Sequence, residues 1–163
     1  MNYLVDALFV GIGATVLLDL ANVARKHLLH IPLPDYGLVG RWIGHMAHGR
    51  FHHVRIASAT PVRGESLLGW LIHYLVGVSF TVLLLAVWGV EWMRHPTIGP
   101  ALLVGLGSVV APFLIMQPAM GGGWAASRAS RPTAARLQSL ATHAIFGLGL
   151  YLAGCINTFV RVL

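Results

Sequence analysis

Long apolar stretches alternate along this chain with shorter segments that hold most of the charged residues. Four stretches are mostly apolar, at about 3–24, 67–90, 98–117 and 135–160. A helix of about 20 apolar residues crosses the hydrocarbon core of a bilayer, and its backbone groups pair within the helix because no water reaches them there. The pattern therefore predicts an all-α membrane protein built as a bundle of four transmembrane helices.

The composition favours the same class. Hydrophobic residues make up 56% of the 163 residues, charged residues only 10%, and the mean hydropathy is +0.74. A soluble domain usually has about a quarter of its residues charged. The length allows one domain, and the single cysteine, Cys155, excludes an internal disulfide.

The distribution of basic residues predicts the orientation. All 11 lysines and arginines except Arg94 and Arg161 lie in two segments, 25–66 and 118–136. The positive-inside rule places both segments in the cytoplasm and both termini in the periplasm of a bacterial inner membrane. No nucleic-acid-binding motif accompanies the net charge of +6, so the expected partners are the bilayer and its anionic headgroups, not nucleic acid.

The segment 38–54 has helical periodicity. Apolar side chains, among them Trp42 and Met46, recur on one face. The opposite face is a cationic stripe of Arg41, His45, His48, His52 and Arg55. We expect an amphipathic helix that lies in the membrane interface, with this stripe toward the lipid headgroups.

An internal repeat relates the two halves of the chain. Residues 7–16 read ALFVGIGATV, and residues 101–110 read ALLVGLGSVV. The second and fourth apolar stretches each place a histidine four residues before a glycine, His73 with Gly77 and His143 with Gly147. This pattern predicts two tandem hairpins related by a pseudo-two-fold axis along the membrane normal. A homodimer is expected from size alone, because four helices form a narrow bundle.

Ionisable groups inside membrane helices are costly and mark candidate functional sites. Asp19, His73 and His143 fall inside the predicted spans, and Gln117 lies near the end of the third. They predict a site that binds or transports a small solute, a metal ion or a proton. The paired histidines His73 and His143 also fit a divalent metal, or a haem b in an electron-transfer protein.

Structural roles compete with this reading. The histidines suit interhelical hydrogen bonds, and Asp19 suits an ion pair with Arg25 or Arg136 near the interface, or a local contact with Asn22. A structural or assembly protein without a ligand site is therefore the alternative. Nothing in the sequence resembles a Ser/His/Asp triad or a carboxylate pair, so an enzyme is not favoured.

Two proline-containing stretches interrupt the third apolar segment. Pro112 lies inside it and predicts a kink, because proline has no N–H to donate to the helix. The run Gln117-Pro-Ala-Met-Gly-Gly-Gly-Trp then ends the helix and allows close approach of the backbone to a neighbour or ligand.

Several motifs together resemble one family. They are Gly40-Arg-Trp-Ile-Gly-His-Met, Gly49-Arg-Phe-His-His, Pro61-Val-Arg-Gly-Glu, Gly69-Trp-Leu-Ile-His-Tyr, Gln117-Pro-Ala-Met-Gly and Ser139-Leu-Ala-Thr-His. Over nearly its whole length the chain resembles the small bacterial inner-membrane proteins grouped as domain of unknown function 2938. The resemblance implies a four-span membrane protein and no particular activity.

Overall fold

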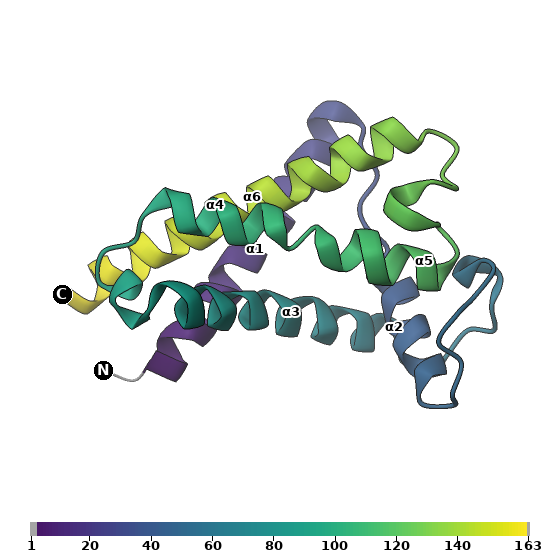
Figure 1. Ribbon diagram of the computed structural model, residues 1–163, viewed down its shortest axis with the longest axis horizontal. Helices are drawn as coiled ribbons and strands as arrows, with labels where there is room; N and C mark the ends of the chain where they lie inside the picture. The colour runs from purple at the N-terminus through teal and green to yellow at the C-terminus, as the bar shows by residue number, and fades with distance from the viewer. Residues whose placement is uncertain (1–2, 163) are drawn as a thin grey trace. The chain divides into compact units, whose positions relative to one another are not determined.

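The structure, a computed structural model, describes residues 3–162, and within them every regular element is helical (Figure 1). The six α-helices are α1 (Tyr3–Leu29), α2 (Tyr36–Met46), α3 (Glu65–Trp88), α4 (Ile98–Gly107), α5 (Gln117–Met120) and α6 (Pro132–Val162). The 3₁₀-helical segments are η1 (Ile56–Ser58), η2 (Val90–Met93) and η4 (Trp124–Ala126), and the π-helical segment is η3 (Pro112–Met116). The all-α class predicted from the sequence is confirmed.

In the described part of the chain, four helical segments are long and apolar enough to cross a membrane: Tyr3–Leu29, Glu65–Trp88, Ile98–Met120 and Pro132–Arg161. Each contains most of one predicted span. The first, third and last continue past the predicted ends at residues 24, 117 and 160, and the second and last also begin earlier than predicted. These four elements could be predicted because the length and the apolar content of a helix are local properties of the sequence.

The third of these segments is interrupted near its middle. Helix α4 ends at Gly107, and a turn at Ser108 and Val109 precedes the π-helical η3. Pro112 cannot donate to the carbonyl of Ser108, which the regular helical pattern would require. In η3 the N–H of Gln117 bonds instead to the carbonyl of Pro112, five residues back. The regular α-helix is therefore interrupted next to Pro112 by a π-turn, and the predicted kink stays a prediction.

The chain divides into two compact units. The first comprises the described parts of 1–33, 74–108 and 141–163, and the second comprises 34–73 and 109–140. The first unit has an apolar core that includes Val10, Ala14, Leu84, Phe146 and Leu150.

Small residues allow the helices of the first unit to approach closely. A Cβ atom at Gly77 of α3 would lie 2.1 Å from the Thr15 hydroxyl oxygen of α1. A Cβ atom at Gly105 of α4 would lie 2.4 Å from the Gly147 Cα atom of α6. Helix backbones that meet at glycines in this way gain van der Waals contact, which is the main attraction between helices in lipid.

The second unit is built around α2, which is shorter than predicted. The helix begins after Asp35, whose carboxylate accepts a bond from the Gly37 N–H, and it ends at Met46 instead of continuing to about residue 54. The left-handed backbone of Gly49, with φ of 76°, directs the chain away from the helix axis. Trp42 of α2 then packs with Ile56 and Ala119 in a small core.

Candidate functional site

The four polar residues predicted to form an intramembrane site are divided between the two units. Asp19 and His143 belong to the first unit, and His73 and Gln117 belong to the second. The pairing of His73 with His143 therefore stays a prediction.

Asp19 lies on a polar line along α1. Its carboxylate accepts a hydrogen bond from the Tyr74 hydroxyl of α3, with an oxygen–oxygen distance of 3.1 Å. Asn22 and Arg25 follow at intervals of three residues, which places all three side chains on one side of the helix. Asp19 is half-buried, and Asn22 is only 6% exposed.

Arg25 connects this line to α6. Its guanidinium donates to the Asn22 side-chain oxygen at 3.2 Å and to the Thr142 hydroxyl at 2.9 Å. The Asn22 side-chain nitrogen is buried and has no hydrogen-bond partner within the described residues. We call Asp19, Asn22, Arg25, Tyr74 and Thr142 the α1 polar line. His143 follows Thr142 on α6 and is half-buried.

The α1 polar line combines groups that suit a small polar ligand or a proton. Asp19 supplies a carboxylate that can take up a proton, and Tyr74 supplies a hydroxyl that already bonds to it. A buried amide nitrogen without a partner costs about 1–3 kcal/mol, so the Asn22 donor favours any acceptor that enters. The apolar helices around these groups strengthen each electrostatic contact.

A second carboxylate on α1 was missed in the sequence. Asp6 is 1% exposed, and one of its oxygens accepts bonds from the side chains of Asn157 and Arg161 of α6. Its other oxygen is buried without a hydrogen-bond partner among the described residues. The sequence did contain a signal for this contact, an acid near the start of the first apolar run and an arginine near the end of the last. If both runs cross a membrane, the two residues lie at the same depth and can pair.

His73 and Gln117 lie in the second unit. The His73 ring stacks on Tyr36 of α2, with ring centroids 4.0 Å apart, and meets Trp70 edge-on at 5.8 Å. The Gln117 side-chain oxygen is buried without a hydrogen-bond partner in the described part of the chain. This environment holds the His73 ring by aromatic contacts.

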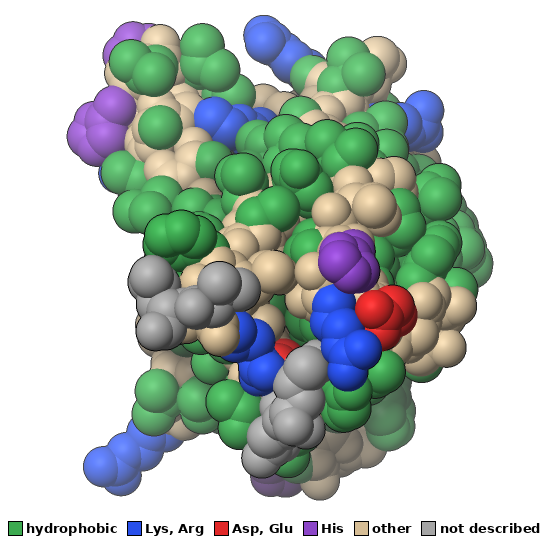
Figure 2. Space-filling view, turned by 90° about the vertical axis from the view of Figure 1, so that its left-hand side faces the viewer, with side chains coloured by type: hydrophobic (Ala, Val, Ile, Leu, Met, Phe, Trp, Pro, Cys, Tyr) green, Lys and Arg blue, Asp and Glu red, His purple; other side chains and the backbone are tan. Residues whose placement is uncertain are grey.

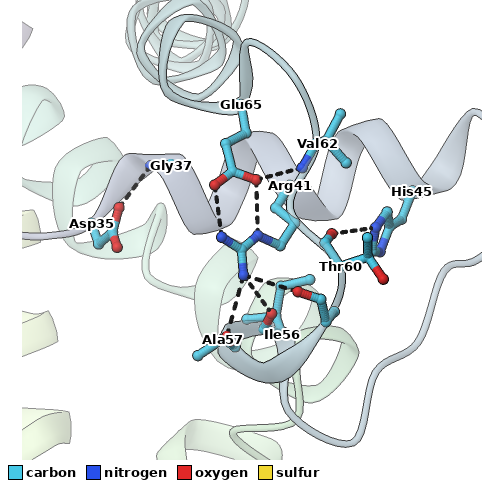
Figure 3. A network of polar contacts seen from close by, with 10 residues as sticks. Asp35, Gly37, Arg41, His45, Ile56, Ala57, Thr60, Val62 and Glu65 are labelled. Carbon is cyan, nitrogen blue, oxygen red and sulfur yellow. Dashed lines mark hydrogen bonds and ion pairs between the residues drawn. The ribbon is translucent and has the colours of Figure 1, made fainter.

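Two residues of the predicted headgroup-facing stripe are engaged inside the second unit. Arg41 makes a two-pronged ion pair with Glu65, at 2.7 and 2.8 Å, and its remaining terminal nitrogen reaches three carbonyls of residues 56–59 (Figure 3). His45 is 7% exposed and bonds to the Thr60 carbonyl at 3.0 Å. The expectation of outward-facing side chains fails for these two residues because the chain after residue 46 folds back over them.

The other three residues of the stripe, His48, His52 and Arg55, are exposed. Headgroup contact stays a prediction for them. The next histidine, His53, lies against His45, with a ring nitrogen–nitrogen distance of 2.7 Å. Because the Thr60 carbonyl can only accept, His45 donates to it and accepts from His53. Burial lowers the pKa of His53, and the neighbouring His45 and Arg50 lower it further.

The structure offers no cluster for a metal among residues 3–162. No three histidine, cysteine, aspartate or glutamate side chains gather there closely enough to hold an ion. A divalent metal or a haem held by His73 and His143 thus stays a prediction from the sequence.

Comparison with known proteins identifies one relationship. No curated protein and no solved structure shows significant similarity to the chain. The family described as protein of unknown function (DUF2938) matches residues 8–157, which is most of the chain and agrees with the resemblance found in the sequence motifs. The chain therefore belongs to the DUF2938 family.

Proposed function

We propose that the chain is an integral protein of the bacterial inner membrane that binds or conducts a small polar solute or ion, and we favour a proton. Four helices of suitable length and apolar character support insertion. Large apolar side chains are exposed along them, for example Leu4, Phe9 and Leu20 of α1, and hydrophobic side chains cover much of the face in Figure 2. Such a surface favours lipid as its surroundings.

The proposed orientation places residues 25–66 and 118–136 in the cytoplasm and both termini in the periplasm. It rests on the basic residues, all but Arg94 and Arg161 of which lie in these two segments. In this orientation the α1 polar line lies toward the cytoplasmic end of the first span.

The observation that supports the proposed function most strongly is the hydrogen bond between Tyr74 and the Asp19 carboxylate within apolar helices. A carboxylate among apolar helices costs solvation free energy, and ionisable residues in such places usually belong to a functional site. The unpartnered amide nitrogen of Asn22 adds a donor one helical turn away. The Asp19 carboxylate and the Tyr74 hydroxyl bonded to it are groups that exchange protons, which is why we favour a proton.

Proton flux into proteoliposomes tests the proposal. Vesicles that hold the purified protein and a trapped pH-sensitive dye are given a pH step and a potassium–valinomycin potential. We expect Asp19→Asn to lose most of the flux, because the amide has the shape of the carboxyl but cannot take up a proton. Asp35→Asn, at the exposed cap of α2, is the matched control and keeps the wild-type rate. Equal flux through wild type, Asp19→Asn and protein-free vesicles would rule out proton conduction.

We also propose that two tandem hairpins form the bundle. Gly11 and Gly105 occupy equivalent places in the two similar sequences, and Gly77 and Gly147 do so in their partners. A Cβ atom at Gly11 would lie 2.6 Å from the Val78 Cα atom, next to Gly77, and one at Gly105 would lie 2.4 Å from the Gly147 Cα atom. Equivalent glycines thus mark the helix crossing in each hairpin, which supports a duplication.

A further inference from the structure

We propose that the turn formed by residues 121–128, together with Arg136, binds a phosphate group, either that of an anionic lipid headgroup or a free phosphate. This turn lies between α5 and α6 in the second unit (Figure 1). The inference goes beyond the proposed proton site, uses none of its residues and does not depend on it.

The backbone of the turn has an uncommon conformation. Gly121 and Gly123 have positive φ, and so do two alanines, Ala125 at 45° and Ala126 at 57°. A left-handed alanine costs about 1 kcal/mol or more, so two in succession need support from their surroundings. The bond from the Arg128 N–H to the Gly122 carbonyl, at 2.9 Å, holds the turn closed. Successive N–H groups form concavities that bind anions where residues of opposite hand follow one another, and here left-handed Ala126 precedes right-handed Ser127.

Polar side chains converge on this backbone. A Cβ atom at Gly123 would lie 2.3 Å from the Ser127 hydroxyl oxygen and 3.0 Å from the Cγ atom of Arg128, so the Ser127 hydroxyl and the aliphatic part of the exposed Arg128 side chain lie against the glycine. Arg136 reaches back from α6, and its Nε atom donates to the Ala125 carbonyl at 2.8 Å. That bond uses one edge of the guanidinium and leaves its terminal nitrogens for a bound anion.

The charges around the turn favour an anion. Arg128, Arg131 and Arg136 lie in or near it, and none of the five acidic residues of the chain follows Glu91. The first turn of α6 adds the partial positive charge of a helix amino end. Guanidinium groups, a hydroxyl and backbone N–H groups are together the donors that bind phosphate oxygens. Trp124 is 64% exposed beside them, as suits a site at a membrane surface.

Amide chemical shifts test this site directly. Protein labelled with ¹⁵N-glycine and ¹⁵N-alanine is purified in maltoside, which carries no phosphate. It is titrated separately with inorganic phosphate and with dihexanoyl phosphatidic acid, and dihexanoyl phosphatidylcholine serves as the zwitterionic comparison. We expect saturable shifts at the amides of Gly123, Ala125 and Ala126. The double variant Arg128→Gln/Arg136→Gln should weaken binding by at least about tenfold, the effect of losing charge-assisted hydrogen bonds.

The matched control is Arg94→Gln, which removes the same charge from an exposed position outside the two basic segments and should leave the affinity unchanged. Shifts with both phosphate and phosphatidic acid would support recognition of the phosphate itself. Shifts with phosphatidic acid alone would support a lipid headgroup site. The absence of shifts in this turn with either compound, or an equal loss in Arg94→Gln, would overturn the proposal. If the double variant does not fold, Ser127→Ala provides the same comparison with a smaller change.

Discussion

Arg41 and Glu65 form a two-pronged ion pair across 24 positions of the chain, with nitrogen–oxygen distances of 2.8 and 2.7 Å. Arg41 projects from α2, and Glu65 is the first residue of α3. Glu65 also accepts from the Val62 N–H at 2.8 Å, and the Arg41 guanidinium bonds to the carbonyls of Ile56, Ala57 and Ala59. The pair therefore fixes the loop between the two helices.

Replacing Arg41 should loosen that loop. Arg41→Lys keeps the charge but loses the planar guanidinium that matches a carboxylate, so we expect the second unit to become less stable and this loop to open more often. Hydrogen exchange of the amides from Ser58 to Val62 measures the effect, because local opening exposes them. Arg55→Lys, at an exposed position, is the control. Unchanged exchange in Arg41→Lys would show that the ion pair does not hold the loop.

Acid should destabilise the second unit through His53. Because burial holds its folded-state pKa below the ordinary value of 6.5, the unfolded chain takes up the proton first as the pH falls. The stability contributed by the neutral ring is therefore present above pH 6.5 and is lost as the pH falls from there through the folded-state pKa. Thermal unfolding of wild type and His53→Gln between about pH 7.5 and 5 measures the slope.

The variant His53→Gln should flatten this pH dependence, whereas His52→Gln, at the exposed neighbouring position, should keep it. The two variants should differ because His53 donates to His45, which in turn donates to the Thr60 carbonyl, whereas His52 is exposed. If both variants keep the wild-type slope, another group governs the acid sensitivity.

The apolar helices could be predicted from the sequence because their length and composition are local properties. The end of α2 could not, because it depends on contacts with distant parts of the chain. The His53 N–H bonds to the Ala119 carbonyl at 2.8 Å, and Trp42 donates to the Phe51 carbonyl at 2.9 Å. These contacts fold residues 50–56 back onto the helix, although helical periodicity continues through them in the sequence.

The candidate site was predicted only in part for a similar reason. Asp19 could be predicted because it is an acid within an apolar run. Its hydrogen bond with Tyr74 could not, because that contact depends on how α1 packs against α3. Arg41 appeared to belong to a solvated face because local spacing alone does not reveal a partner as distant as Glu65. Asp6 was missed as a site residue because its partners, Asn157 and Arg161, lie at the other end of the chain.

Glycine-to-alanine substitutions at two positions of α4 should distinguish the effect of helix packing on stability from that of helix propensity. Gly105→Ala places a methyl group 2.4 Å from the Gly147 Cα atom, and we expect it to destabilise the first unit by about 1–3 kcal/mol or more. Gly107→Ala in the same helix meets nothing within 4 Å, and its better helix propensity should stabilise slightly. Thermal unfolding in one detergent compares them. Equal effects of the two variants would contradict a close helix crossing at Gly105.

Substitutions of Asp6 and Arg161 should have strongly coupled effects on stability. Arg161→Met leaves the buried Asp6 carboxylate without its charged partner and should cost about 2–4 kcal/mol. The double variant Asp6→Asn/Arg161→Met should recover part of that loss, because no unpaired charge remains. A double-mutant cycle of unfolding free energies measures the coupling, and additive effects would show that the two residues act independently.

Cysteine accessibility tests the central claim, that the chain crosses the membrane four times with residues 25–66 in the cytoplasm. Cys155 is the single native cysteine, so Cys155→Ser provides a clean background. In this background, Arg94→Cys and His52→Cys each introduce one thiol at an exposed position outside the four apolar helices. We predict that a membrane-impermeant maleimide labels the variant at 94 in spheroplasts and labels the variant at 52 only after permeabilisation. Labelling at 52 in intact spheroplasts, with none at 94, would contradict the account.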